Sequence, residues 1–319
     1  KLDQDTLDKL VENTISQRRD RLQEPRFVSQ ALSSYALRGK DSPYLLAPSN
    51  RQLRSAKLSK LAKVLAALPN TRHRTTYFGP RDGAAVTKIV AIGKRHRKVR
   101  PRKPVVYRKT RGTEIFFVPK DVAQSQIILM LPKPPIPFEE RPKAELYNGY
   151  VGGGMGGLIF QELREARGLA YSAFAGHRAG RRPKDQSGVF GYIGTQSDKT
   201  IDALTTMLDL LRHLPMQPDR LAKAKQAIDR RYRASRVDPR AVANWVLAWD
   251  DLGRDKDPRP FYWETIGKLD QAALESFAAQ FSSGPAIISL MGDESRIDMA
   301  ALGKIGTIRR VKPEQLVSW

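Results

Sequence analysis

The segment at residues 152–172 has the sequence GGGMGGLIFQELREARGLAYS, and the interpretation of the chain starts from it. Its glycine-rich start interrupts a helix predicted over residues 144–151, and a second helical stretch is predicted over 158–167. A strand is predicted directly afterwards, over 170–176. A glycine turn before a helix can hold phosphate, but no Lys-Ser/Thr pair and no spaced G-x-G-x-x-G pattern follows here. The glycines therefore indicate a tight turn and close helix packing.

The surrounding residues predict an α+β fold, in which helices cover an antiparallel sheet. Further strands are predicted over 114–120, 124–131 and 188–195. A long basic helix is predicted over 221–236. Another helix is predicted from a stripe of apolar residues at helical spacing, formed by Ile201, Leu204, Met207, Leu208 and Leu211. Helices grouped on one face of an antiparallel sheet fit this order.

An internal repeat runs through the chain. The sequence Pro25-Arg26-Phe27-Val28 recurs as Pro239-Arg240-Ala241-Val242, at an offset of 214 residues. After a slip of one residue, an offset of 213 pairs Leu61 with Leu274, Val64 with Phe277, Leu68 with Phe281, Gly79 with Gly292 and Val86 with Met299. Each copy is predicted to contain a helix after the proline, an amphipathic helix, a short strand (75–78 or 286–291) and a last helix, which in the first copy carries Val86, Ile89 and Ile92.

The repeat predicts the division into domains. Residues 105–319 form a complete second copy, residues 1–95 form the carboxy-terminal part of a first copy, and residues 96–104 form a basic linker. The second copy is expected to begin with a strand near Val105, so the matching start of the first copy would lie roughly 110 residues before Lys1. We therefore expect a fragment of a longer protein, or a chain that has been cut.

Composition limits the possible functions. The 319 residues include no cysteine, which excludes disulfides, thiolate metal sites and a cysteine nucleophile. No apolar run approaches the roughly 20 residues of a transmembrane helix, so no transmembrane segment is expected. The formal net charge is +23. Basic clusters at 94–103 and 178–184 indicate a solvated linker and loop, or a patch that attracts polyanions. Without interleaved aromatic residues or a known binding motif, we expect no specific nucleic-acid partner.

One motif connects the chain to a family. Glu162-Leu163-Arg164-Glu165 is followed by Gly168-Leu169-Ala170-Tyr171, seven residues separating Arg from Tyr. This pattern resembles the carboxy-terminal domain of insulinase-type (pitrilysin-type, inverzincin-like) zinc peptidases. In that family a zinc-bearing half polarises the scissile carbonyl and activates water. The resemblance implies that Arg164 and Tyr171 are catalytic: Tyr171 would donate to the developing oxyanion, and Arg164 would hold the peptide backbone.

The zinc motif itself is absent from the sequence. There is no H-x-x-E-H or H-E-x-x-H, and the four histidines are His73, His96, His177 and His213, with no i, i+4 pair. We therefore expect no metal and no cofactor to be bound by this chain, and the resemblance implies zinc in a missing or partner half. Where the family places a third zinc ligand, Glu12 is the only nearby candidate, and it is poorly placed. The first copy is thus expected to be non-catalytic.

The leading hypothesis is the carboxy-terminal, substrate-gripping part of a zinc-dependent endopeptidase resembling pitrilysin and insulysin. The alternative is a non-catalytic partner or scaffold subunit of the same family. The expected partners are a peptide substrate and a zinc-bearing amino-terminal half or partner subunit. The residues leave the compartment open, and the resemblance favours a bacterial periplasm or envelope.

Overall fold

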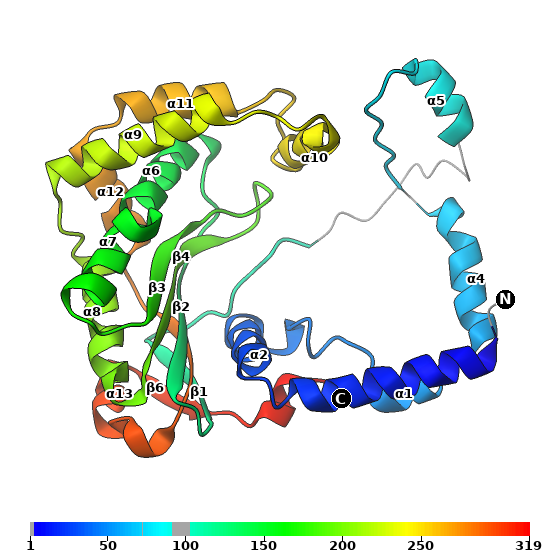
Figure 1. Ribbon diagram of the computed structural model, residues 1–319, viewed down its shortest axis with the longest axis horizontal. Helices are drawn as coiled ribbons and strands as arrows, with labels where there is room; N and C mark the ends of the chain where they lie inside the picture. Colours follow the sequence, from blue (N-terminus) through cyan, green and yellow to red (C-terminus); the bar gives the residue numbers. More distant parts are fainter. Residues whose placement is uncertain (1–2, 72, 91–102) are drawn as a thin grey trace.

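The computed structural model describes residues 3–71, 73–90 and 103–319, with a six-stranded sheet at its centre (Figure 1). The strands lie in the order β3-β4-β2-β5-β1-β6. Their bounds are β1 (Glu114–Pro119), β2 (Gln124–Lys133), β3 (Ser172–Arg178), β4 (Ser187–Gln196), β5 (Ile287–Gly292) and β6 (Thr307–Arg310). The predicted α+β class is confirmed.

The sheet is antiparallel on one side and parallel on the other. Strands β3, β4, β2 and β5 are antiparallel neighbours, as expected. Strand β1 instead lies between β5 and β6 and is parallel to both, with Glu114 opposite Ile287 and Thr307. Parallel pairing requires a long crossover, and here the chain between β1 and β5 contains most of the helices.

The strand expected near Val105 does not form there. The Val105 amide donates to the carboxylate of Asp185 at 2.8 Å, and the Val105 carbonyl accepts from the amide of Gln186 at 3.0 Å. These bonds attach the segment to the loop before β4. A loop does not present the regular row of backbone N–H and C=O groups that a strand pairs with, so the first strand begins only at Glu114.

One face of the sheet is covered by the helices of the second half of the chain. They are α6 (Arg141–Gly152), α7 (Leu158–Phe160), α8 (Thr200–Arg212), α9 (Pro218–Ala234), α11 (Arg259–Lys268), α12 (Gln271–Phe281) and α13 (Met299–Ile305). Helix α10 (Val242–Asp251) lies apart from the sheet and has no buried residue (Figure 1). The largest core cluster lies between the covering helices and the sheet and includes the fully buried Tyr147 and Tyr150 of α6. Each tyrosine hydroxyl has a partner, Tyr147 with Ser282 at 2.9 Å and Tyr150 with the Pro215 carbonyl at 2.7 Å. Burial therefore leaves neither polar tip unsatisfied.

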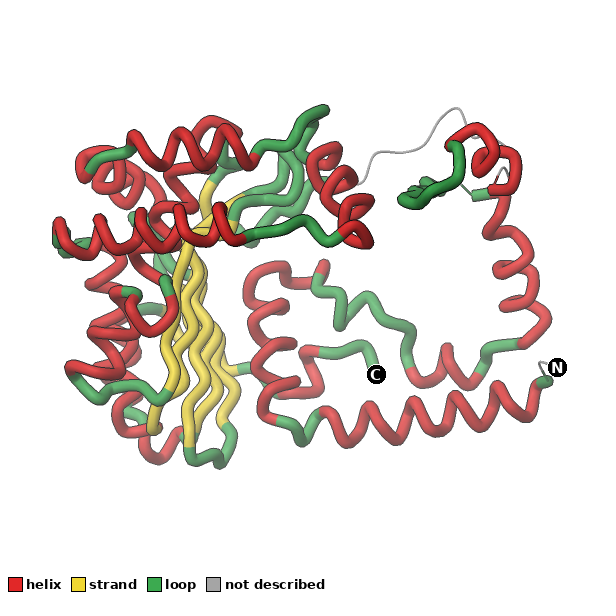
Figure 2. The backbone as a smooth tube through the Cα atoms, turned by 45° about the horizontal axis from the view of Figure 1, so that its top comes forward, coloured by secondary structure: helices red, strands yellow, loops and turns green. Residues whose placement is uncertain are grey.

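The opposite face of the sheet is covered by α2 (Pro25–Arg38), so helices lie on both sides of the sheet (Figure 2). Helix α1 (Gln4–Arg21) precedes it and extends away from the sheet (Figure 2). Helix α2 has proline in its first turn and ends at Gly39, whose φ of 57° is a conformation that favours glycine. It packs Val28 and Leu32 on β1 and β5, which forms the second core cluster. The helix predicted after Pro25 is confirmed.

The remaining amino-terminal helices lie away from the sheet. They are α3 (Asn50–Arg54), α4 (Leu58–Ala67) and α5 (Gly83–Val90), and α4 has no buried residue. The amphipathic helix predicted around Leu61 and Val64 is confirmed, and Ile92, expected in the last helix, lies outside the described residues. The short strand predicted over 75–78 is wrong: these residues form neither helix nor strand. A strand needs a neighbour, and none of the sheet's strands comes from the first copy.

The spacing of helices follows the predicted offsets. Helices α1 and α9 begin at Gln4 and Pro218, and α4 and α12 begin at Leu58 and Gln271. The internal repeat and the division at 1–95 and 105–319 nevertheless stay predictions, because the described part of the first copy contributes no strand to compare. Most of the predicted linker at 96–104 lies outside the described residues. Among the described helices, none has both the length and the apolar composition needed to cross a bilayer.

Candidate functional site

Arg164 lies on a π-helix. Helix α7 passes directly into η5 (Gln161–Ala166), whose hydrogen-bonding pattern is one residue wider than that of an α-helix. Short π-helical segments are rare and frequently occur at functional sites. Leu163 is fully buried and fixes this segment to the core, whereas Arg164 beside it points outward. The predicted helix over 158–167 is confirmed as helical, although its second half is not an α-helix.

A tight turn brings Tyr171 back toward the π-helix. The Leu163 carbonyl accepts from the amides of Leu169 at 2.8 Å and Ala170 at 3.1 Å, which folds the chain over its own helix. Gly168 makes the turn with φ of 56°. The Tyr171 amide then donates to the Gly194 carbonyl at 2.8 Å, so Tyr171 extends the β3–β4 ladder by one residue. The strand itself begins at Ser172, two residues later than predicted.

The structure brings the two predicted site residues together. The guanidinium carbon of Arg164 lies 5.9 Å from the ring centroid of Tyr171 and 4.9 Å from that of Phe160. Both side chains are open to solvent, at 48% for Arg164 and 72% for Tyr171. The nearest carboxylate to Arg164 is that of Glu165 at 3.7 Å, an exposed ion pair worth less than about 1 kcal/mol. No hydrogen bond to another described residue occupies the Tyr171 hydroxyl. Both polar groups are therefore available to a ligand.

The glycine turn before α7 serves packing. A Cβ on Gly152 would lie 2.2 Å from the Ala175 carbonyl oxygen of β3, and one on Gly157 would lie 2.6 Å from the Gly153 nitrogen. Gly154 has φ of 67°. Only glycine allows α6 to approach the strand this closely. The predicted role of the glycines in close packing is confirmed.

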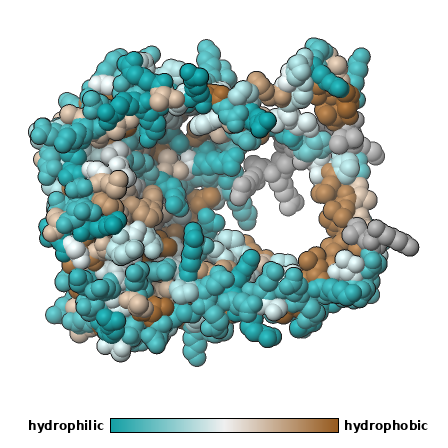
Figure 3. All heavy atoms as spheres, in the orientation of Figure 1, coloured by the Kyte–Doolittle hydropathy of each residue, from teal (hydrophilic) through white to brown (hydrophobic). Residues whose placement is uncertain are grey.

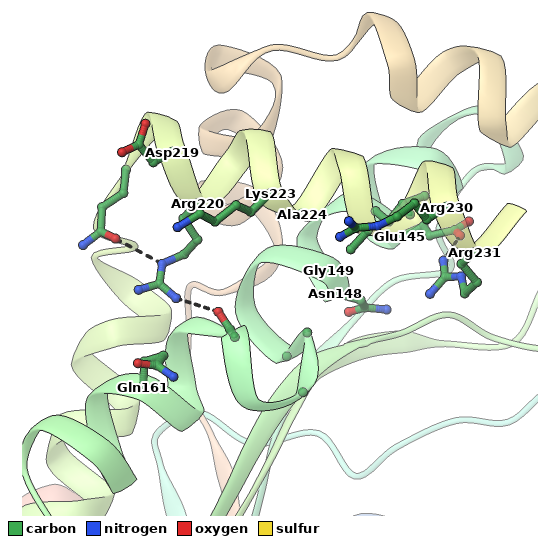
Figure 4. A pocket seen from close by; sticks show the side chains of 17 residues that line it. Glu145, Asn148, Gly149, Gln161, Asp219, Arg220, Lys223, Ala224, Arg230 and Arg231 are labelled. Carbon is green, nitrogen blue, oxygen red and sulfur yellow. Dashed lines mark hydrogen bonds and ion pairs between the residues drawn. The ribbon is translucent and has the colours of Figure 1, made fainter. Parts of the chain in front are cut away.

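A groove that the sequence did not predict lies beside this turn (Figure 4). It has a volume of about 1080 Å³ and is lined by α9, α6 and the glycine turn at residues 152–157; we call it the α9 groove. Arg220 of α9 donates to the Gly156 carbonyl at 2.9 Å and to the Gln217 side chain at 3.1 Å, which connects α9 to the turn. The basic residues of α9 recur at helical spacing along the groove, but the sequence does not reveal which element they face.

The described residues offer no metal centre. No three histidine, cysteine, aspartate or glutamate side chains within them come together to hold an ion. His177 is buried with its ring edge-on to Phe277 and Phe281, and burial, aided by the nearby charge of Arg141, lowers its pKa to about 4. Glu12 is on the surface and pairs with Arg54 at 2.9 Å. His96 lies outside the described residues.

Comparison with known proteins places the chain in a family. The family model described as the peptidase M16 inactive domain matches residues 57–228, which is more than half of the chain. The chain therefore belongs to the peptidase M16 inactive-domain family, and the insulinase-type resemblance of its sequence is confirmed. The coarse function follows from this: the chain is of the inactive-domain type found in zinc-protease-like proteins, and the sequence carries no zinc motif of its own.

Curated relatives agree with the family. An uncharacterized zinc protease of Mycobacterium tuberculosis is 35% identical over 95 residues, covering 27% of this chain and 22% of that protein. An uncharacterized zinc protease of Streptomyces coelicolor is 31% identical over 154 residues, covering 47% of this chain and 32% of that protein. The chain thus matches less than a third of the length of either relative.

Solved structures share the fold. The peptidase M16 inactive domain from Pseudomonas fluorescens superposes with a TM-score of 0.69 at 16% identity, covering 91% of this chain and 71% of that one. A protease from Helicobacter pylori superposes with a TM-score of 0.66 at 14% identity, covering 92% and 73%. At these identities the likeness concerns the fold.

Proposed function

We propose that this chain is the substrate-gripping part of a zinc-dependent endopeptidase, and that the zinc-binding half lies outside these residues. The observation that carries the proposal is the Arg164–Tyr171 pair: the turn at Gly168 holds the guanidinium and the phenol side by side, facing solvent, with no competing partner for the hydroxyl among the described residues. Two hydrogen-bond donors without a hydrogen-bond partner of their own within the described ranges are better suited to binding a substrate backbone than to stabilising the fold.

The chemistry assigned to each residue follows from its functional groups. Hydrolysis of a peptide bond places negative charge on the carbonyl oxygen, and a preorganised donor aimed at that oxygen lowers the barrier. The Tyr171 hydroxyl supplies that donor. The planar guanidinium of Arg164 offers several N–H groups in a fixed fork, which suits carbonyl oxygens of the substrate backbone. Zinc in the other half would polarise the same carbonyl and supply the water.

Apolar residues exposed on α4 and at Leu68, which directly follows it, support a further unit outside these residues. Leu61, Val64 and Leu68 are exposed at 41%, 61% and 51%, and apolar side chains gather over α4 at the right of Figure 3. Their predicted equivalents in the second copy are Leu274, Phe277 and Phe281, which are 1%, 1% and 3% exposed. In the second copy these positions belong to the core that packs on the sheet. The face of α4 therefore fits a corresponding sheet-bearing unit.

Helix α10 also exposes apolar residues whose predicted equivalents in the other copy are buried. Trp245 and Val246 are exposed, whereas the residues 214 positions earlier, Ala31 and Leu32, are buried where α2 meets the sheet. An exposed apolar face of this kind marks an interaction surface. Both helices thus support a further unit with its own sheet, and by the repeat offsets this unit is the rest of the first copy, which is expected to be non-catalytic.

The alternative is a non-catalytic partner or scaffold subunit. Both proposals agree with the finding that no group of potential metal ligands exists among the described residues. The two proposals differ in whether the Tyr171 hydroxyl affects turnover in the complete protein.

The test uses the full-length protein loaded with zinc and a fluorogenic peptide. We expect Tyr171→Phe to lower kcat roughly 100-fold with little change in KM, because the lost donor acts in the transition state. Tyr77→Phe, which removes the hydroxyl of another exposed tyrosine, serves as the control and should retain full turnover. Unchanged turnover in Tyr171→Phe would rule out the oxyanion role. Saturable peptide binding without any cleavage in the zinc-loaded protein would establish the non-catalytic alternative.

A further inference from the structure

The α9 groove carries an excess of positive charge. Four of its lining side chains are cationic, namely Arg220, Lys223, Arg230 and Arg231, and two are acidic, namely Glu145 and Asp219. Glu145 is already occupied, because it pairs with Arg231 and accepts from the Tyr232 hydroxyl at 2.9 Å. Within the described ranges, neither Lys223 nor Arg230 has a carboxylate partner. Two cations therefore face the groove without compensation.

The dimensions of the groove suit an extended peptide. Arg220 and Arg231 are eleven positions apart on α9, which corresponds to about 16 Å at the rise of an α-helix. An extended chain covers that distance with about five residues. The lining also includes residues without a side chain, and at two of them, Gly154 and Gly156, a Cβ would meet no other atom within 4 Å, which leaves room for a second backbone there.

The nature of the lining favours peptide over nucleic acid. No aromatic ring lines the groove, so no surface is available on which bases could stack. Two amide side chains, Gln161 and Gln217, lie at one end and can both donate to and accept from a peptide backbone.

The groove begins beside the Arg164–Tyr171 pair. Gln161 lines the end of the groove where Arg220 reaches the glycine turn, and Arg164 follows Gln161 by three positions on η5. Arg164 therefore lies within one turn of η5 from the end of the groove.

We propose that the α9 groove binds an acidic segment of the peptide substrate, about five residues long and adjacent to the residues held by Arg164 and Tyr171. This inference rests on the proposed function and adds a substrate class to it. Lys223 and Arg230 pair with Asp or Glu side chains of the segment, and Arg220 closes the end nearest the site. Charge complementarity of this kind selects among substrates more than it raises affinity in general.

The test compares two labelled peptides that differ only in charge. One carries four Glu residues beside a neutral cleavable stretch, and the other carries Gln at the same four positions. Binding is measured by fluorescence anisotropy with the full-length protein, in a chelator that prevents cleavage and at about 0.15 M salt to suppress long-range attraction. We expect the Glu peptide to bind at least roughly tenfold more tightly.

Two variants with the same change in net charge locate the effect. Lys223→Gln with Arg230→Gln should abolish the preference for the Glu peptide and leave the affinity for the Gln peptide unchanged. Lys268→Gln with Lys304→Gln removes two exposed lysines outside the groove and should keep the preference. Equal loss in both double variants would overturn the proposal, because the overall charge would then be responsible. So would the absence of any preference, or tighter binding of heparin with the same dependence on Lys223 and Arg230.

Failure of this inference is distinguishable from failure of the proposed function. If only the groove is wrong, Tyr171→Phe still lowers kcat, and it does so equally for both peptides. If only the catalytic role is wrong, the Glu peptide keeps its preference for the intact groove while Tyr171→Phe leaves turnover unchanged.

Discussion

The side chain of Asn148 exchanges two hydrogen bonds with the backbone of His177. The Asn148 amide nitrogen donates to the His177 carbonyl at 3.0 Å, and the His177 amide donates to the Asn148 carbonyl oxygen at 2.6 Å. Since β3 is an edge strand, these groups would otherwise lie unpaired beside α6. One side chain thus takes the place of a neighbouring strand at this position.

Loss of this side chain should destabilise the protein. Asn148→Ala leaves a buried N–H and a buried C=O without partners, and we expect a loss of about 2–4 kcal/mol in the free energy of unfolding. Urea denaturation provides the measurement. Asn70→Ala, at the exposed end of a short 3-10 helix (Leu68–Asn70), is the matched control and should change stability by less than about 0.5 kcal/mol. Equal stability of the two variants would mean that the edge of β3 finds other partners.

The buried ring of His177 predicts a pH dependence of stability. Its pKa of about 4 in the folded protein is below the 6.5 of an exposed histidine, because burial disfavours the charged ring. The unfolded chain therefore binds more protons between these values, and stability falls as the pH decreases from about 6.5 to 4, by about 3 kcal/mol in total. Denaturation at a series of pH values should show this slope. His177→Leu should flatten it, whereas the exposed His73→Gln should not.

The glycine turn predicts a large difference between two similar substitutions. Gly152→Ala would place a methyl group 2.2 Å from the Ala175 carbonyl oxygen, so α6 must move away from β3. We expect a loss of about 2–3 kcal/mol, measured as a drop in Tm. Gly156→Ala meets nothing within 4 Å and has no positive φ, so its Tm should equal or slightly exceed that of the parent. Similar Tm values for both variants would contradict the packing role.

Gly168 predicts a coupling between backbone conformation and the site. Its φ of 56° is unfavourable for residues with a Cβ, yet a Cβ there would meet no other atom within 4 Å. Gly168→Val should therefore act through the backbone alone, lower stability by more than about 1 kcal/mol and separate Arg164 from Tyr171. Gly168→Asn should recover much of the loss, because Asn tolerates this region. Parallel measurement of Tm and kcat in the full-length protein checks both effects.

The helices that the sequence predicted well are those with a strong local pattern. The stripe from Ile201 to Leu211 became α8, and the proline and glycine around α2 became its ends. Arg164 and Tyr171 could be singled out because their spacing matches a family motif, and the turn between them is short enough that its geometry is local.

The features that were missed depend on distant parts of the chain. Strand β1 pairs in parallel with β5 and β6, which lie more than 160 residues later in the chain. The sequence around Glu114 does not indicate which strands become its neighbours. Residues 75–78 have the composition of a strand without a strand beside them. The π-helix η5 follows from how Leu163 and the turn fit the core, and the α9 groove depends on the approach of α9 to α6, which periodicity alone does not give.

The packing of α2 on β5 constrains the order in which the molecule can fold during synthesis. Helix α2 packs Leu32 on β5, which lies some 255 residues later in the chain, and Arg18 lies over the ring of Trp319. At ordinary translation rates, the apolar face of α2 remains uncovered for on the order of tens of seconds before β5 has been synthesised. During that interval it is an exposed apolar surface of the kind that chaperones bind, and this part of the fold can be completed only after Trp319 has left the ribosome.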